Sequence, residues 1–230
     1  MTSRGREATS AIAALVAIGG LLFFAAGCGP AGSVASPSSA TASPAPTATL
    51  AASGPQKIMG GLLQPGEYTT TVFKPTLHFT LGDSWIALAA DDPTGIGMDR
   101  PDETGLFAFT RLAKVIDATT HQVVAAPDDL LAWLLTHPSF DWSGGRTPVQ
   151  IAGLSSEMLD GHVQGKGSSE LFAYDEGNLR VIGGAHVRIY NLPLDGRDLT
   201  ILVTGYENES NFEAIAKAAQ TILDSLEIIP

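Results

Sequence analysis

Two stretches decide the fold, Ala185-His-Val-Arg-Ile-Tyr190 and Leu199-Thr-Ile-Leu-Val-Thr204. In both, apolar residues recur at every second position, which is typical of a strand that buries one face. Asp195-Gly196 lies between them and predicts the turn of an antiparallel hairpin, with a loop longer than the minimal type. We therefore expect the core to be built on an antiparallel sheet.

A helix is expected directly after this hairpin. Ser210-x-x-Glu213 matches a capping box, which predicts a helix N-terminus. Apolar side chains then follow at spacings of three and four residues: Phe212, Ile215, Ala219, Ile222 and Leu226. This spacing predicts an amphipathic helix over residues 210–226 that docks on the sheet.

The rest of the domain contributes further strands and one more helix. Pro127, Asp128 and Asp129 suit the first turn of a helix, which we expect over 127–137. Alternation and β-branched residues predict strands over 68–73, 77–81, 85–90, 106–115, 148–154, 157–163 and 171–174, with a loop over 91–103. The expected fold is α+β: a central antiparallel β-sheet of about six or seven strands flanked by a middle helix and a C-terminal helix.

The N-terminus has the layout of an export signal. Arg4 and Arg6 precede an uncharged, largely apolar stretch that ends at Gly27. Ala25-Ala-Gly-Cys28 resembles the bacterial lipobox, which implies that residues 1–27 are a lipoprotein signal peptide. It also implies that Cys28 carries fatty acyl chains such as palmitate, and that they hold the protein on the outer face of the bacterial cytoplasmic membrane. An uncleaved transmembrane anchor is the alternative, because a stretch of this length can span a bilayer.

A tether is expected between the lipid and the folded domain. Residues 29–56 consist of 8 Ala, 6 Ser, 5 Pro, 3 Thr and 3 Gly with Val34, Leu50 and Gln56, and none of them is charged. Such a composition cannot bury enough apolar surface to offset the entropy of ordering. The segment is either a bare spacer or an O-glycosylated stalk. The predicted organisation is thus 1–27 signal peptide, 28–56 lipidated cysteine and disordered tether, and 57–230 a single domain.

Composition excludes several classes of protein. The chain has 13 Lys and Arg against 24 Asp and Glu, a net charge of −11, which argues against nucleic-acid binding. The single cysteine cannot form an internal disulfide. We expect no cofactor.

A family resemblance covers most of residues 68–228. Phe73-Lys-Pro-Thr-Leu-His-Phe-Thr-Leu-Gly-Asp-Ser-Trp85 is similar to the opening of PsbP-like and LpqN-like domains, an apolar strand with a Trp at its end. Pro148-Val-Gln-Ile-Ala-Gly-Leu154, with a strand after it and a helix at the C-terminus, is similar too. The resemblance implies an antiparallel sheet flanked by helices and a binding or assembly role at the cell envelope. The resemblance assigns no functional residue to this chain.

The sequence contains no short catalytic or metal-binding motif. The histidines are His78, His121, His137, His162 and His186, and none forms an H-E-x-x-H or H-x-x-x-H pair, so we expect them on the surface. Gly153-Leu-Ser-Ser-Glu157 departs from G-x-S-x-G at its last residue. The acidic segment 91–103 has the oxygen density that calcium prefers, but not the EF-hand spacing. A solvated acidic loop and a calcium site therefore both remain open there.

Phe140 and Trp142 are the candidate binding residues. They lie in Phe140-Asp-Trp-Ser-Gly-Gly145, where two aromatics could form a stacking platform for a sugar or a partner, or could cover the edge of the core. The predicted function is a non-enzymatic binding or assembly module that is anchored to the membrane through Cys28. Its partner is an envelope protein or a small ligand. The alternatives are an envelope hydrolase with an active site assembled from distant residues, and a small solute-capture domain.

Overall fold

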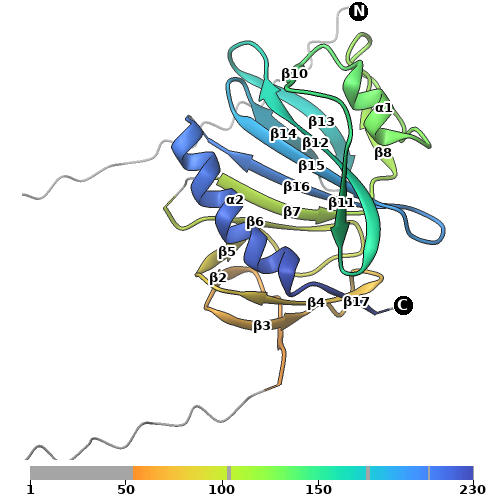
Figure 1. Cartoon of the computed structure of the whole chain (residues 1–230). Coiled ribbons are helices and arrows are strands. Elements are labelled where there is room, and N and C mark those ends of the chain that lie inside the picture. Colours follow the sequence, from red (N-terminus) through yellow and green to blue (C-terminus); the bar gives the residue numbers. More distant parts are fainter. Residues whose placement is uncertain (1–53, 103–104, 175–176, 207, 230) are drawn as a thin grey trace, which may run out of the picture. The chain divides into compact units, whose positions relative to one another are not determined.

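The computed structural model describes residues 54–102, 105–174, 177–206 and 208–229. These residues are mostly β-structure, with 48% in strands and 13% in helices. The described strands form three sheets, of nine, four and four strands (Figure 1).

The nine-stranded sheet is the centre of the domain. Its strands, in spatial order, are β10 (Phe140–Trp142), β12 (Leu154–Val163), β15 (His186–Leu192), β16 (Leu199–Gly205), β7 (Gly105–Thr110), β6 (Gly95–Asp99), β5 (Trp85–Ala87) and β2 (Gly61–Leu63). Strand β11 (Thr147–Ile151) pairs with β12 beside β10. All these pairs are antiparallel. The predicted hairpin is confirmed as β15 and β16, which pair from His186 with Gly205 to Leu192 with Leu199.

Two smaller sheets cover the large one. The first has the order β1 (Gln56–Lys57), β3 (Gly66–Thr69), β4 (Thr76–Leu81) and β17 (Glu227–Ile229). The second has the order β14 (Gly177–Ile182), β13 (Ser168–Tyr174), β8 (Lys114–Ile116) and β9 (Val123–Ala125). The pair β1 with β3 is parallel, and the other pairs of these two sheets are antiparallel.

The described part of the chain has two helices. Helix α1 (Leu130–Leu135) is shorter than expected, because Asp129 takes the N-cap position and its carboxylate accepts from Ala132 N at 2.9 Å. Helix α2 (Glu209–Asp224) lies where the periodicity predicts it. The predicted cap at Ser210 is wrong, because Asn208 is the N-cap and its side chain accepts from Asn211 N at 2.9 Å. Figure 1 shows α2 lying across the sheet at β16 and β7.

The large sheet separates two hydrophobic cores. Along β16, Ile201 belongs to the core beneath α2 and the β1-β3-β4-β17 sheet, whereas Leu202 belongs to the core beneath α1 and the other small sheet. Ile189 and Tyr190 of β15 are divided in the same way. This follows from the alternation of side chains along a strand. Both faces of β7 and β16 are covered, so these two strands are buried throughout.

The prediction of an α+β domain with one central sheet of six or seven strands is therefore wrong. One cause is that short strands leave little periodicity in the sequence. Gly95–Asp99 forms β6 inside the segment expected to be a loop, and 106–115 is divided between β7 and β8. The other cause is that the second core is covered mainly by the sheet β14-β13-β8-β9, which local patterns assign to no separate layer.

Candidate functional site

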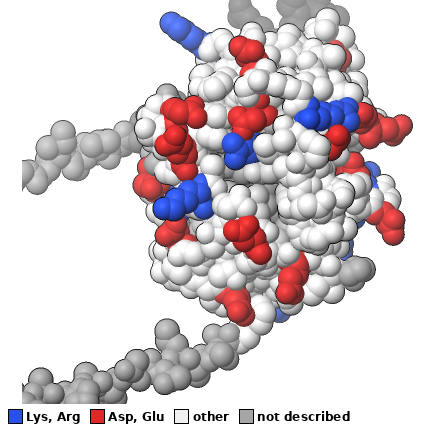
Figure 2. All heavy atoms as spheres, viewed as in Figure 1, with Lys and Arg blue, Asp and Glu red and all other residues white. Residues whose placement is uncertain are grey.

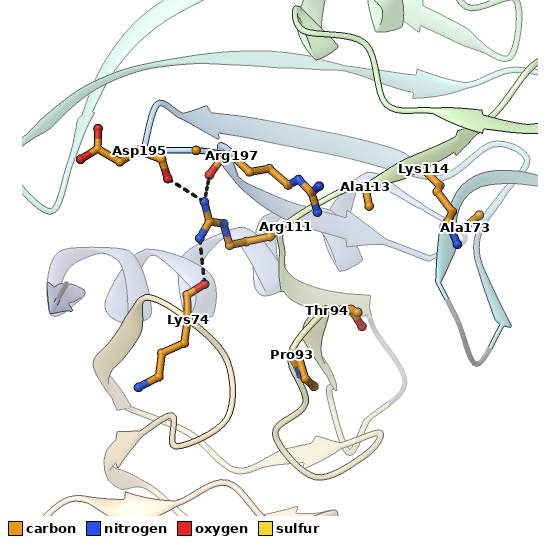
Figure 3. A pocket seen from close by; sticks show the side chains of 10 residues that line it. Lys74, Pro93, Thr94, Arg111, Ala113, Lys114, Ala173, Asp195 and Arg197 are labelled. Carbon is orange, nitrogen blue, oxygen red and sulfur yellow. Dashed lines mark hydrogen bonds between the residues drawn. The ribbon is translucent and has the colours of Figure 1, made fainter.

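A pocket of about 390 Å³ lies where three connecting segments meet. They are the segment before β4, the end of β7, and the turn between β15 and β16 (Figure 3). Four of the lining residues are basic, Lys74, Arg111, Lys114 and Arg197, and one, Asp195, is acidic. The whole chain has 13 basic and 24 acidic residues. The lining thus reverses the charge balance of the protein.

Arg111 fixes the geometry of this pocket. It follows the last residue of β7, and its backbone amide donates to Thr94 O at 3.1 Å. Its guanidinium donates to the carbonyl of Lys74 at 3.3 Å, to that of Asp195 at 3.1 Å, and to that of Arg197 (Figure 3). One planar group with several donors can hold three carbonyl oxygens at once. Arg111 therefore ties the turn between β15 and β16 to the segment that precedes β4.

Arg197 supplies a cation that is available to a ligand. It follows Gly196, whose φ of +80° makes the turn, and its side chain is exposed. Its guanidinium makes no hydrogen bond or ion pair with another residue in the described part of the chain. Lys114 starts β8 on the other side of the pocket, and the Lys74 ammonium donates to Thr76 Oγ1 at 2.9 Å.

A second pocket, of about 520 Å³, adjoins the first. Both are lined by Ala113, Gly196 and Arg197. In the second pocket the Asn191 amide donates to Asp198 Oδ2 at 2.7 Å and accepts from Thr200 Oγ1 at 3.3 Å. Arg197 therefore stands at the boundary between a basic pocket and one with fixed polar groups.

The predicted binding residues Phe140 and Trp142 lie elsewhere, on β10 beside α1. Their rings stack with centroids 4.7 Å apart, and the Trp142 indole donates to Leu134 O at 2.7 Å. Phe140 is 6% exposed and belongs to the core under α1. Neither residue lines either of the two pockets. A binding role for the pair stays a prediction.

The acidic residues of segment 91–103 turn to separate partners. Asp91 accepts from the backbone amides of residues 71–73, and Asp92 Oδ1 accepts from Thr94 N and Gly95 N. Asp99 accepts from the Tyr206 hydroxyl at 3.2 Å. The described carboxylates of this segment thus hold loops and strands in place, and calcium binding there stays untested. Glu103 lies outside the described residues.

The histidines are not all on the surface. His137 is buried, and burial lowers the pKa of its imidazole. The His186 side chain is 10% exposed and lies beside His162, with ring centroids 4.4 Å apart. Glu209 contacts both, and its hydrogen bond with His186 holds the pKa of the Glu209 carboxyl below its usual range. His162, His186 and Glu209 line neither of the two pockets.

Local motifs could find neither group of residues. The basic residues of the pocket come from positions 74, 111, 114 and 197, and only the tertiary structure brings them together. His162 and His186 meet because of the register between two strands, which the sequence does not specify. The sequence gives one indication of this cluster: His186 occupies a polar position of a strongly alternating strand.

The predicted lipid-attachment residue, Cys28, lies outside the described residues, as do the signal peptide and most of the tether. Among the residues that the structure does describe, no helix has the length and the apolar character needed to cross a membrane. Lipidation and the alternative of a transmembrane anchor therefore stay predictions.

The sequence matches no protein-family model and no curated protein. A similar solved structure is that of LpqN, which is involved in cell envelope biogenesis of Mycobacterium tuberculosis. The two sequences are 13% identical, the match covers 74% of this chain and 83% of LpqN, and the TM-score is 0.32. LpqN is thus a structural neighbour, but a similarity of this size does not establish a shared fold. Membership of the LpqN-like or PsbP-like family stays a prediction.

Proposed function

We propose that this chain is a non-enzymatic binding protein of the bacterial cell envelope, anchored through lipid on Cys28, and that its pocket at Arg197 takes a small anion. The N-terminal pattern from Arg4 to Cys28 supports the location. One observation carries the choice of ligand: four basic residues line a single pocket in a chain with a net charge of −11.

The physical case for an anion rests on where the charge is held. Arg111 is fixed by carbonyl oxygens, so its positive charge stays in the wall of the pocket. Arg197 stands at the rim, and a guanidinium binds carboxylate or phosphate oxygens in a bidentate manner. A hollow of about 390 Å³ has the size of a small-molecule site. The ligand class is therefore a small carboxylate or phosphate compound.

The acidic remainder of the surface supports selectivity for that pocket. Figure 2 shows one face of the protein on which acidic side chains are widely spread, with basic ones interspersed among them. Anions are repelled from such a surface and attracted to a local cationic hollow. The same charge keeps the domain from lying flat on anionic lipid.

Isothermal titration with inorganic phosphate and with citrate, at low ionic strength, tests the pocket. We expect the whole chain to bind at least one of these probes and Arg197→Ala to bind it about tenfold or more weakly, because removing one charge-assisted hydrogen bond of a pair costs that much. Arg180→Ala is the matched control. It removes the same charge from β14, where Arg180 pairs with Glu170 at 2.6 Å. If the whole chain binds neither probe, or Arg197→Ala and Arg180→Ala bind equally well, the pocket is not the site.

The anchor has its own test. We expect Cys28→Ala to release the protein from the membrane fraction or to leave it unprocessed, because the thiol that receives the lipid is gone. An unchanged size and membrane fraction in this variant would contradict the lipoprotein prediction.

An envelope hydrolase is the second candidate, and one observation favours it. His162, His186, Asp160 and Glu209 converge from three elements, as an active site assembled from distant residues requires. They lie outside the basic pocket, so the two candidate functions use different residues. Hydrolysis of p-nitrophenyl acetate that His162→Gln abolishes would support the enzyme, and no turnover above that of buffer would exclude it for this ester.

A further inference from the structure

The pairing of two strands creates a row of polar side chains on the face that α2 covers. His162 of β12 is directly opposite His186 of β15, and Asp160 is directly opposite Arg188. Directly opposed residues of neighbouring antiparallel strands point to the same side of the sheet. The row lies towards one edge of the core beneath α2, at the end where that helix begins.

The first turn of α2 is held tightly against this row. Gly205 pairs with His186, and a Cβ atom on Gly205 would lie 2.4 Å from Phe212 Cα, so a residue without a side chain lets the helix approach. The Phe212 ring stacks on the His186 ring, with centroids 3.5 Å apart and an angle of 10° between the planes. Phe212 therefore fixes the plane of the imidazole.

The first residue of α2, Glu209, completes the group. His186 Nδ1 lies 2.9 Å from Glu209 Oε1, and His162 Nε2 lies 3.5 Å from Glu209 Oε2. The ligand atoms of the three side chains all lie within 4.8 Å of one another. Ligand atoms on a tetrahedral zinc ion lie about 3.3 Å apart, given bond lengths of about 2.0–2.1 Å. The spacing already approaches that of a metal site.

A metal-bound histidine usually donates its other ring N–H to a carboxylate, and Asp160 is placed to accept it from His186. Its Oδ1 lies 2.5 Å from His186 Nε2, and its Oδ2 lies 2.5 Å from the Arg188 guanidinium. With its Nε2–H donated to Asp160, His186 offers its Nδ1 lone pair to a metal ion when that ion replaces the Nδ1 proton that otherwise bonds Glu209. Arg188 balances the charge of Asp160, so Glu209 is the anionic ligand of the set.

We propose that His162, His186 and Glu209 bind a divalent transition-metal ion of the zinc type, with Asp160 orienting His186. Two imidazoles and one carboxylate suit such an ion, whereas calcium and magnesium prefer an all-oxygen set. The side chains of His162 and Glu209 are 51% and 57% exposed, so an ion can enter from solvent. Three protein ligands leave a fourth position for water. This site is independent of the anion pocket.

Titration of the untagged whole chain in detergent with zinc chloride, at neutral pH, tests the proposal. We expect one zinc ion to bind per chain, and His162→Gln and Glu209→Gln each to weaken binding about tenfold or more. Both residues are half exposed, so both variants keep the core intact. His121→Asn is the matched control: it removes an exposed histidine at a φ of 55°, a conformation that Asn tolerates.

Cobalt gives a spectroscopic readout of the same site. We expect Co²⁺ to develop visible absorption bands typical of low coordination numbers with the whole chain and with His121→Asn, and to lose them with His162→Gln. No zinc binding to the whole chain would overturn the proposal. Equal binding by His162→Gln and His121→Asn would overturn it too, because the ion would then sit elsewhere.

Discussion

Asp91→Ala is the substitution from which we expect the largest loss of stability through hydrogen bonding. Asp91 is 9% exposed, and its carboxylate accepts from three consecutive backbone amides. The donors are Thr71 N, Val72 N at 2.7 Å and Phe73 N at 2.8 Å. These amides belong to the segment between β3 and β4, which places the fully buried Phe73 in the core beneath α2.

The magnitude follows from the burial of each donor. The buried Phe73 amide loses a charge-assisted hydrogen bond and cannot reach water, which costs about 2–3 kcal/mol. The other two amides are partly accessible and cost about 1 kcal/mol each. The total of about 4–5 kcal/mol is a large part of the stability of a typical domain.

Urea unfolding followed by tryptophan fluorescence measures this loss. Asp83→Ala is the control, because the Asp83 carboxylate is 59% exposed and water can replace its contact with Arg100 at 3.2 Å, so the pair contributes about 1 kcal/mol. A loss for Asp91→Ala that is no larger than the loss for Asp83→Ala would refute the reasoning.

Three further variants test other parts of the structure. Burial lowers the pKa of His137, so the unfolded chain takes up a proton first as the pH falls below about 6.5, and the free energy of unfolding decreases there. His137→Asn should flatten this acid-side slope, and an unchanged slope would contradict the assignment. Gly205→Ala should cost about 1–3 kcal/mol, because its Cβ would collide with the backbone of Phe212, whereas Gly144→Ala meets no atom within 4 Å and should be neutral in the same urea titration. Trp142→Ala should lower the free energy of unfolding by about 2–4 kcal/mol, since its indole packs beside α1; a melting temperature equal to that of the unmodified chain would instead favour a surface role.

The sequence predicts the regular elements better than their arrangement. Strands 77–81 and 199–204 and helix 210–226 are confirmed within a few residues, because each has a long and unbroken periodicity. Strand β6 contains Gly95 and Gly97, which have no side chain to mark a polar face, and its pairing with β7 and β5 makes it a strand. Short strands of this kind depend on their neighbours rather than on their own residues.

The candidate sites could not be predicted, since both depend on contacts between distant residues. The sequence around Arg111 shows only a charged residue at the end of a strand. Its role in holding the pocket comes from its hydrogen bonds to the carbonyls of Lys74 and Arg197. The sequence predicts His186 as an exposed strand residue, but in the structure the stacked ring of Phe212 covers it. In the sequence, His186 follows His162 by 24 positions, and the register of β12 against β15 decides that they meet.

The pairing of β7 with β16 has a consequence for when this protein can fold. Thr110 pairs with Thr200 and Gly105 with Gly205, so 90 and 100 residues of chain separate the partners at the middle of the sheet. The conformational entropy of a loop of that length must be lost before most of the stabilising contacts form. Both hydrophobic cores use these strands, so neither core is complete until residues 199–205 have joined the sheet. Until these strands have paired, the apolar residues of both cores stay exposed and need protection from aggregation.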